Sequence, residues 1–180
     1  MKKLDLLGAV CAFPFIIISM SSNAALIDNG GGLIYDDVLN ITWAQPDALR
    51  TWDEGNTWAA GLTLGGVSGW RLPYISVAAG AGPFTGTPVD CSTATEAACR
   101  DNEMGYMFYH NLGGTLGQSI LTSGDPDLAL FPTLQWGVYW TGTDKESIFA
   151  WDFHFGYGET NPGGGPRVMT ISPGLSTQAI

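Results

Sequence analysis

The clearest hydrophobic pattern lies near the end of the chain, from Ile148 to Phe155. Bulky aromatic side chains alternate there with smaller or polar ones. One set is Phe149, Trp151, Phe153 and Phe155, and the other is Ala150, Asp152 and His154. Because successive side chains of a β-strand point to opposite sides of the sheet, this alternation predicts a strand with one aromatic and one polar face. Val138–Thr143, which contains two adjacent aromatic residues, is predicted to be a second strand.

Two segments have the features of helices. Thr51–Leu64 begins with Thr51 and carries Glu54 three residues later, which is the spacing of a capping box. Asn102–Leu112 has apolar residues at helical spacing, and Asn102 is a suitable first cap. The apolar set is Met104, Met107, Phe108 and Leu112. A stripe of methionine and aromatic residues is typical of a core, so we expect it to face the interior.

The rest of the chain is rich in turns. Leu26–Trp43 is predicted to form an opening hairpin, and Arg167–Ile171 a last short strand. Tyr74–Ala98 is expected to be irregular because five glycines and prolines interrupt it. The sequence therefore predicts an α+β fold that is loop-rich, with two short helices and small antiparallel sheets.

The first 24 residues have the order of a secretory signal peptide. Lys2 and Lys3 form a basic start, Leu6–Met20 is largely apolar, and Ser22-Asn23-Ala24 places small residues where a signal peptidase reads them. The apolar stretch is short for a membrane-spanning helix, although an anchor that stays attached is an alternative. We therefore expect residues 25–180 to form a single exported domain with no stable membrane anchor.

The chain is strongly acidic. It has 7 Lys+Arg and 17 Asp+Glu, and removal of residues 1–24 leaves 5 basic and 16 acidic residues, a net charge of −11. Nucleic acids and anionic polysaccharides are bound by basic patches, so this charge argues against both as partners.

Cysteine usage agrees with export. Cys11 lies in the signal segment, and Cys91 and Cys99 remain. An even number of cysteines in an exported protein favours a disulfide. A metal-binding or redox pair is the alternative, but the spacing matches no common motif of either kind.

A glycine-rich stretch, Gly65–Pro73, follows the first predicted helix. Its three glycines allow positive φ angles or a close approach of the backbone to another segment. Trp70 offers a large apolar anchor with one N–H group to satisfy. Arg71 either pairs with a carboxylate inside the fold, which is the usual situation for a half-buried arginine, or reaches a ligand.

Four segments resemble the family named for the C-terminal domain of the Legionella collagen-like adhesin Lcl. They span about residues 27–155 and include Gly-Trp-Arg-Leu-Pro, the most specific element. The segments are Tyr35-Asp36-Asp37 with Leu39–Trp43, Thr51–Ala59 with Gly65-Gly66 and Gly69–Pro73, Asn102–Tyr109 with Asn111–Gly113, and Tyr139–Thr143 with Ala150-Trp151. The resemblance implies a C-type-lectin-like domain that is secreted or displayed on the surface of a bacterium and serves in binding or adhesion. In the namesake it implies a trimer that binds glycosaminoglycans, a ligand class that the charge of −11 argues against here.

The sequence contains no recognisable catalytic motif. His110 and His154 have no nucleophile motif near them, and no Gly-x-Ser-x-Gly or phosphate-binding glycine loop is present. We therefore assign no catalytic residue, no metal ligand and no cofactor. Calcium at one of the short acidic turns stays an alternative, because carboxylates are its usual ligands. These turns are at Asp28, Asp36-Asp37, Asp125 with Asp127, and Asp144 with Glu146.

The aromatic residues are the best candidates for binding, since exposed rings stack on sugars or fill protein pockets. The four residues that we select are Trp70, Arg71, Trp140 and Trp151. We expect an exported, non-enzymatic binding or adhesion module that recognises a carbohydrate or a protein at the cell surface. The periplasm and the extracellular space are both open as its location. The alternative is a structural or matrix protein that forms a homo-oligomer and binds no small ligand.

Overall fold

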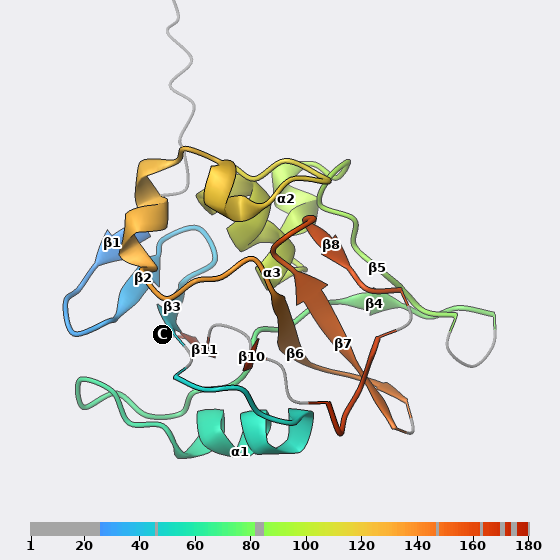
Figure 1. The fold of residues 1–180 in the computed structure, drawn as a ribbon, viewed down its shortest axis with the longest axis horizontal. Helices are drawn as coiled ribbons and strands as arrows, with labels where there is room; N and C mark the ends of the chain where they lie inside the picture. Colours follow the sequence, from blue (N-terminus) through green and yellow to red (C-terminus); the bar gives the residue numbers. More distant parts are fainter. Residues whose placement is uncertain are drawn as a thin grey trace, which may run out of the picture.

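The fold is organised around an antiparallel hairpin of strands β6 (Val138–Glu146) and β7 (Phe149–His154). In Figure 1 this hairpin runs between helix α1 (Trp52–Gly61) on one side and helix α3 (Glu103–Tyr106) on the other. The computed structural model describes residues 26–45, 47–81, 85–146, 148–162, 164–169, 172–173 and 176–179. The predicted signal peptide, residues 1–24, lies outside these ranges.

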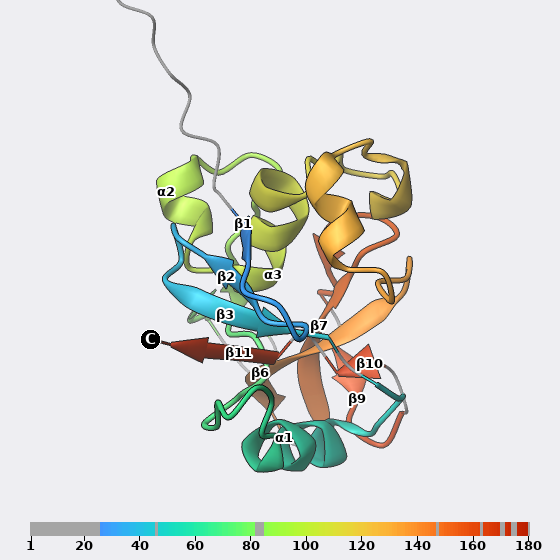
Figure 2. The same cartoon turned by 90° about the vertical axis from the view of Figure 1, so that its left-hand side faces the viewer.

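The described strands form three sheets. The first has the order β1-β2-β3-β11, with β1 at Leu26–Asp28, β2 at Ile34–Asp36, β3 at Ile41–Ala44 and β11 at Ser176–Ala179. The second has the order β10-β6-β7-β8, with β9 also paired to β7; β8 is Glu159–Thr160, β9 is Gly165–Pro166 and β10 is Ser172–Pro173. The third is the short pair β4 (Val77–Ala78) and β5 (Thr87–Pro88). All pairings are antiparallel except β10 with β6, and Figure 2 shows β11 lying beside β3.

The predicted helices are present. Thr51 caps α1 in a capping box, because its side chain accepts from the Glu54 N–H while the Glu54 carboxylate accepts from the Thr51 N–H. The second predicted helix begins at α3, where the Asn102 side chain accepts from the Gly105 N–H, and continues as a π-helix over Met107–Asn111. Three short helical elements were not predicted: helix α2 (Glu96–Cys99) and the 3-10 helices Ile120–Thr122 and Pro126–Leu130. The Tyr74–Ala98 segment, expected to be irregular, contains the start of α2 and two strands of two residues each.

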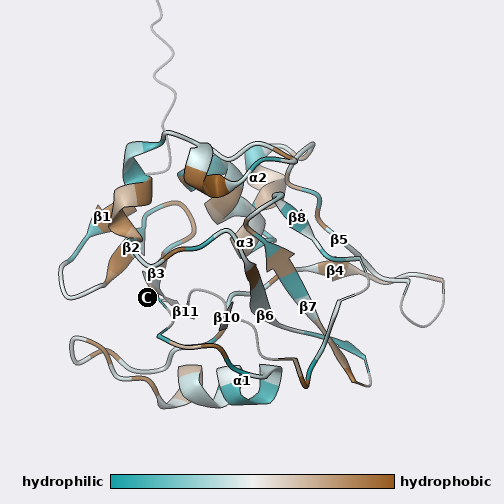
Figure 3. Ribbon diagram, viewed as in Figure 1, coloured by the Kyte–Doolittle hydropathy of each residue, from teal (hydrophilic) through white to brown (hydrophobic). Residues whose placement is uncertain are grey.

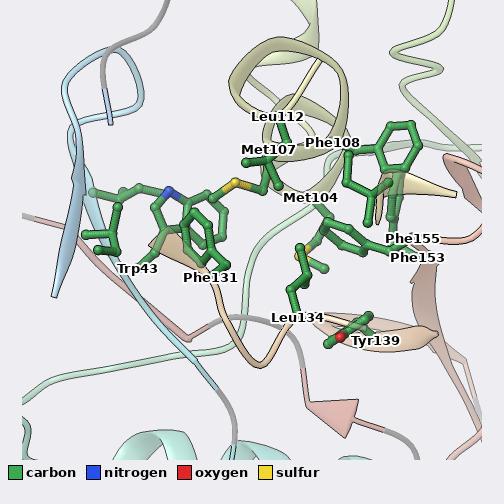
Figure 4. Close-up of a cluster of buried hydrophobic side chains, with 13 residues drawn as sticks. Trp43, Met104, Met107, Phe108, Leu112, Phe131, Leu134, Tyr139, Phe153 and Phe155 are labelled. Atoms are coloured by element: carbon green, nitrogen blue, oxygen red, sulfur yellow. The ribbon is translucent and has the colours of Figure 1, made fainter. Parts of the chain in front are cut away.

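The main core joins this second helix to the aromatic face of β7. Figure 4 shows Phe108 against Phe153 and Phe155, with Trp43 and Phe131 at the other end of the cluster. The centroid of the Phe108 ring is 5.8 Å from that of Phe153 and 5.8 Å from that of Phe155. Met104, Met107, Phe108 and Leu112 are all fully buried, as expected. The predicted opening hairpin and the mixed α+β class are likewise confirmed.

Two strand predictions need correction. Figure 3 shows hydrophobic and hydrophilic residues following one another along β7, yet Ala150 and Asp152 on its expected polar face are 0% and 1% exposed. That face is covered because Trp140, Ala150 and Leu72 pack there with Ala59 of α1. The predicted last strand is wrong at Arg167–Met169, which form a turn closed by a bond from the Met169 N–H to the Pro166 carbonyl. Residues 170 and 171 lie outside the described ranges.

The three glycines of the Gly65–Pro73 stretch adopt the positive φ angles that their sequence allows. Gly65, Gly66 and Gly69 have φ angles of 58°, 82° and 83°, which residues other than glycine rarely adopt. Within the described ranges, every helix is too short or too polar to cross a lipid bilayer.

Candidate binding site

Three of the four predicted binding residues are in the interior. Trp70, Trp140 and Trp151 are 3%, 0% and 2% exposed. The Trp70 indole N–H donates to the Val67 carbonyl at 3.0 Å, and that of Trp140 donates to the Arg50 carbonyl at 3.1 Å. These rings therefore stabilise the fold, and none of them offers an open face on which a sugar could stack.

Arg71, the fourth predicted residue, forms a clamp inside the fold. Its guanidinium donates two bonds to the Glu103 carboxylate, at 2.8 and 2.6 Å, and the Tyr74 N–H donates to the same carboxylate at 2.6 Å. The hydrogen bonds that Arg71 donates to Glu103 raise the pKa of Arg71. This is the structural role that the sequence left open. The Arg71 side chain stays 43% exposed and lines a shallow hollow of about 250 Å³ with Asn56 and Tyr74.

The acidic turns serve mainly as local caps. The carboxylate of Asp36 is buried and accepts from the Val38 and Leu39 N–H groups and from the Asn111 side chain. Asp125 caps a 3-10 helix by accepting from the Asp127 N–H. In the described part of the chain, no three His, Cys, Asp or Glu side chains are grouped so that they could hold a metal ion. The Cys91–Cys99 disulfide is formed.

An exposed aromatic cluster lies at the C-terminal end of β7. Trp136 is 58% exposed and Tyr157 is 48% exposed, so both rings are open to solvent. The centroid of the His154 ring is 6.1 Å from that of Trp136 and 4.5 Å from that of Tyr157. We call these three residues the aromatic platform.

Backbone bonds fix the loops that carry the platform. The Gln135 N–H donates to the Tyr139 hydroxyl at 2.8 Å, and the Phe155 N–H donates to the Gly137 carbonyl at 2.9 Å, so both neighbours of Trp136 are tied to the sheet. The Gly117 N–H donates to the Tyr157 carbonyl at 2.7 Å. A ligand that binds to preorganised rings does not have to order them, which favours affinity.

Gly156 allows the rings of the platform to come together. A Cβ atom at this position would lie 2.6 Å from Cε1 of His154 and 2.9 Å from Cε3 of Trp136, which is closer than real contacts allow. The Gly156 N–H also donates to Nδ1 of His154 at 2.8 Å. Burial lowers the pKa of His154, so the neutral ring that accepts this bond is favoured at neutral pH.

A hollow of about 300 Å³ begins beside the platform. Gly158 and Glu159, which follow Tyr157, line it together with Leu116 and Asp90. Glu159 pairs with His154 across the β7–β8 ladder, so its carboxylate is next to the platform as well. An apolar surface bordered by a hollow with hydroxyl and carboxylate groups has the two features that sugar sites combine.

Sequence reasoning missed the platform because neither Trp136 nor Tyr157 belongs to a recognisable motif. They are 21 positions apart in the sequence, and in the structure they are linked through the His154 ring. The available signal was indirect: a tryptophan between Gln135 and Gly137, and a tyrosine between two glycines, stand outside any hydrophobic pattern.

Comparison with known proteins gives no further guidance. No family model, no curated protein and no solved structure matches this chain. Function has to be inferred from the geometry of the platform and its surroundings.

Proposed function

We propose that this chain is an exported, non-enzymatic binding module that recognises a carbohydrate at the cell surface through the aromatic platform. The observation that carries the proposal is the pair of exposed rings, Trp136 and Tyr157, which both lie next to the His154 ring on loops fixed by hydrogen bonds. Apolar faces of sugar rings stack on such side chains. The resemblance to the Lcl C-terminal-domain family, which implies a lectin-like fold, also supports a binding function.

Export is part of the proposal. The Cys91–Cys99 disulfide supports it, because disulfides persist mainly in oxidising compartments. The predicted signal peptide supports it independently. The acidic charge of the chain directs the choice of ligand toward neutral or cationic sugars and away from anionic polysaccharides.

A glycan array probed with purified residues 25–180 tests the proposal. Wild-type protein is expected to bind a subset of glycans, and Trp136→Ala and Tyr157→Ala are each expected to weaken that binding about 10-fold or more, as loss of a central aromatic contact does. Tyr74→Ala is the matched control, because Tyr74 is 51% exposed but lies at the Arg71 hollow. Repeating the screen with a chelator tests the calcium alternative.

Two results would contradict the proposal. The first is the absence of glycan binding by the wild-type protein. The second is equal loss in all three variants, which would mean that the effect is not specific to the platform.

A structural or oligomeric role is the second candidate. Ile148, Val168 and Met169 are 64%, 82% and 51% exposed, and the Arg167 N–H donates to the Ile148 carbonyl, which brings the two segments together. Exposed apolar residues of this kind are found where copies of a chain associate. Sedimentation velocity of residues 25–180 distinguishes the candidates, because an oligomer that binds no glycan would favour this role.

A further inference from the structure

Lys145 is a buried lysine without a hydrogen-bond partner. It is the single lysine after residue 24, it is 6% exposed, and its Nζ atom is buried. The Nζ atom lies 3.6 Å from the centroid of the Trp151 ring. A cation over an indole ring gains a favourable interaction, but a ring face cannot accept all three N–H bonds that an ammonium group can donate.

The charges around Lys145 do not neutralise it. Asp144, its neighbour in β6, is engaged by Arg167. Glu146, on its other side, is exposed to solvent, where its charge is screened. Among the described residues no carboxylate lies within salt-bridge distance of Nζ, and burial lowers the pKa of Lys145. A buried charge without a hydrogen-bonded partner is unfavourable, so an acceptor that bonds to Nζ would stabilise the site.

A hollow is present where such an acceptor could enter. It has a volume of about 360 Å³. Lys145, Trp151 and the two carboxylate neighbours of Lys145 line one side, and β4 lines the other together with Ala79, Gly80 and Gly86. Figure 1 shows the β4–β5 pair beside the β6–β7 hairpin. The hollow is large enough for a small organic molecule. Among its described lining residues Lys145 is the basic one, Asp144 is already paired with Arg167, and Glu146 is exposed to solvent.

We propose that this hollow is a second binding site, which takes a small ligand through a carboxylate group paired with Lys145. Because Nζ is buried against the Trp151 ring, the Lys145 side chain would turn toward the hollow on binding. The carboxylate would then accept its free N–H bonds in a partly desolvated place, where charge-assisted bonds are strong. The site is separate from the aromatic platform, because Trp151 and His154 point to opposite faces of β7.

The single lysine makes the test direct. Residues 25–180 labelled with 13C-lysine give one lysine Cε signal in an NMR spectrum, and that signal reports on Lys145 alone. The protein is titrated with sodium acetate at constant ionic strength, and in parallel with acetamide, which has the same shape without the charge. Acetate is expected to produce a saturable shift of the Cε signal and to raise the pKa of Lys145 by at least about 0.5 units, because an anion favours the charged amine. Acetamide is expected to produce neither change.

Variants separate this site from the platform. Lys145→Met keeps an unbranched apolar side chain over Trp151. Its affinity for acetate, measured by tryptophan fluorescence, is expected to be at least about 10-fold lower than that of the wild type. Trp136→Ala is expected to bind acetate as the wild type does, so failure of the platform proposal would leave this one standing. The proposal is overturned if the Lys145 signal does not respond to acetate in a saturable way or responds equally to acetamide. Should Lys145→Met not fold, the wild-type titrations alone still decide.

Discussion

Asp152 is an acidic residue of β7 that lies in the interior of the fold. It stands in the polar register of β7, but the fold buries it to 1% exposure opposite Trp140. Its Oδ2 atom accepts a long bond of 3.5 Å from the Asn161 side chain, and its Oδ1 atom has no hydrogen-bond partner. Burial raises the pKa of Asp152 to about 7, so the fold favours the neutral acid.

Substitution Asp152→Asn should therefore stabilise the protein in a pH-dependent way. The wild type keeps its full stability below the unfolded pKa of about 4. It loses stability as the pH rises toward the folded pKa of about 7, because Asp152 is ionised in the unfolded chain there but still protonated in the fold. Asparagine never ionises, so the variant should match the wild type at pH 4. At pH 8 it should be more stable by up to about 4 kcal/mol, since each pKa unit corresponds to about 1.4 kcal/mol.

Urea unfolding at pH 4, 6 and 8 measures this difference. Asp101→Asn is the control, because it makes the same chemical change at an exposed position. A difference between Asp152→Asn and the wild type that does not change with pH would show that Asp152 is not the titrating group.

At the scale of elements, the Arg71–Glu103 clamp joins the Gly65–Pro73 stretch to α3. Arg71→Met should cost about 1–3 kcal/mol of unfolding free energy, less than for a fully buried pair because the arginine is partly exposed. Adding Glu103→Gln should recover part of this loss, because the amide removes the unpaired charge and can still accept from the Tyr74 N–H. A double-mutant cycle in denaturant measures the coupling.

The Arg100–Glu96 pair offers the comparison for this clamp. Its side chains are 47% and 44% exposed, so Arg100→Met should change stability by less than about 1 kcal/mol. If Arg71→Met were equally mild, or if the double variant were no more stable than Arg71→Met, the clamp would not be a stabilising element.

Elements with local signals could be predicted, and elements that depend on distant packing could not. The capping box of α1 and the apolar spacing of Asn102–Leu112 are contained in a few adjacent residues, and both helices begin where expected. The π-helical bonds of Met107–Asn111 leave no signature in the apolar spacing. Likewise, β7 alternates as a half-exposed strand would, because nothing in its own residues reveals that Trp140 and α1 cover its second face.

At the scale of the whole molecule, distant packing also explains why three of the selected binding residues, Trp70, Trp140 and Trp151, are buried. Segments distant in sequence are bound to one another: the Gly142 N–H donates to the Pro73 carbonyl at 2.8 Å, and the Trp52 indole donates to the Thr141 carbonyl at 2.8 Å. As a result, the tryptophans of the recognisable motifs, Trp70, Trp140 and Trp151, are buried. The exposed ring is Trp136, which belongs to no motif and is presented by a loop that the sheet fixes.

The Cys91–Cys99 disulfide is the covalent constraint on this loop-rich molecule. It closes a short loop, with a sequence separation of 8, that contains Ser92 of the hollow beside the platform, and it packs against Tyr106 of α3. Closing a loop of this length stabilises a fold by about 2.5 kcal/mol, chiefly by restricting the unfolded chain. Reduction of residues 25–180 should therefore lower the free energy of unfolding by about that amount.

Guanidinium unfolding of oxidised and reduced protein measures this effect, and Cys91→Ala with Cys99→Ala provides a form that no reductant can change. Because the loop is short and its cysteines pack in a cluster separate from the main core, we expect the reduced protein to remain folded, with platform-dependent glycan binding retained. Loss of the whole fold on reduction would instead mean that the α2–α3 region depends on the disulfide for its packing. Identical unfolding of the two forms would mean that the reduced loop is already held by the contacts of Tyr106 and Asn102, whose side chain donates to the Val89 carbonyl at 2.9 Å.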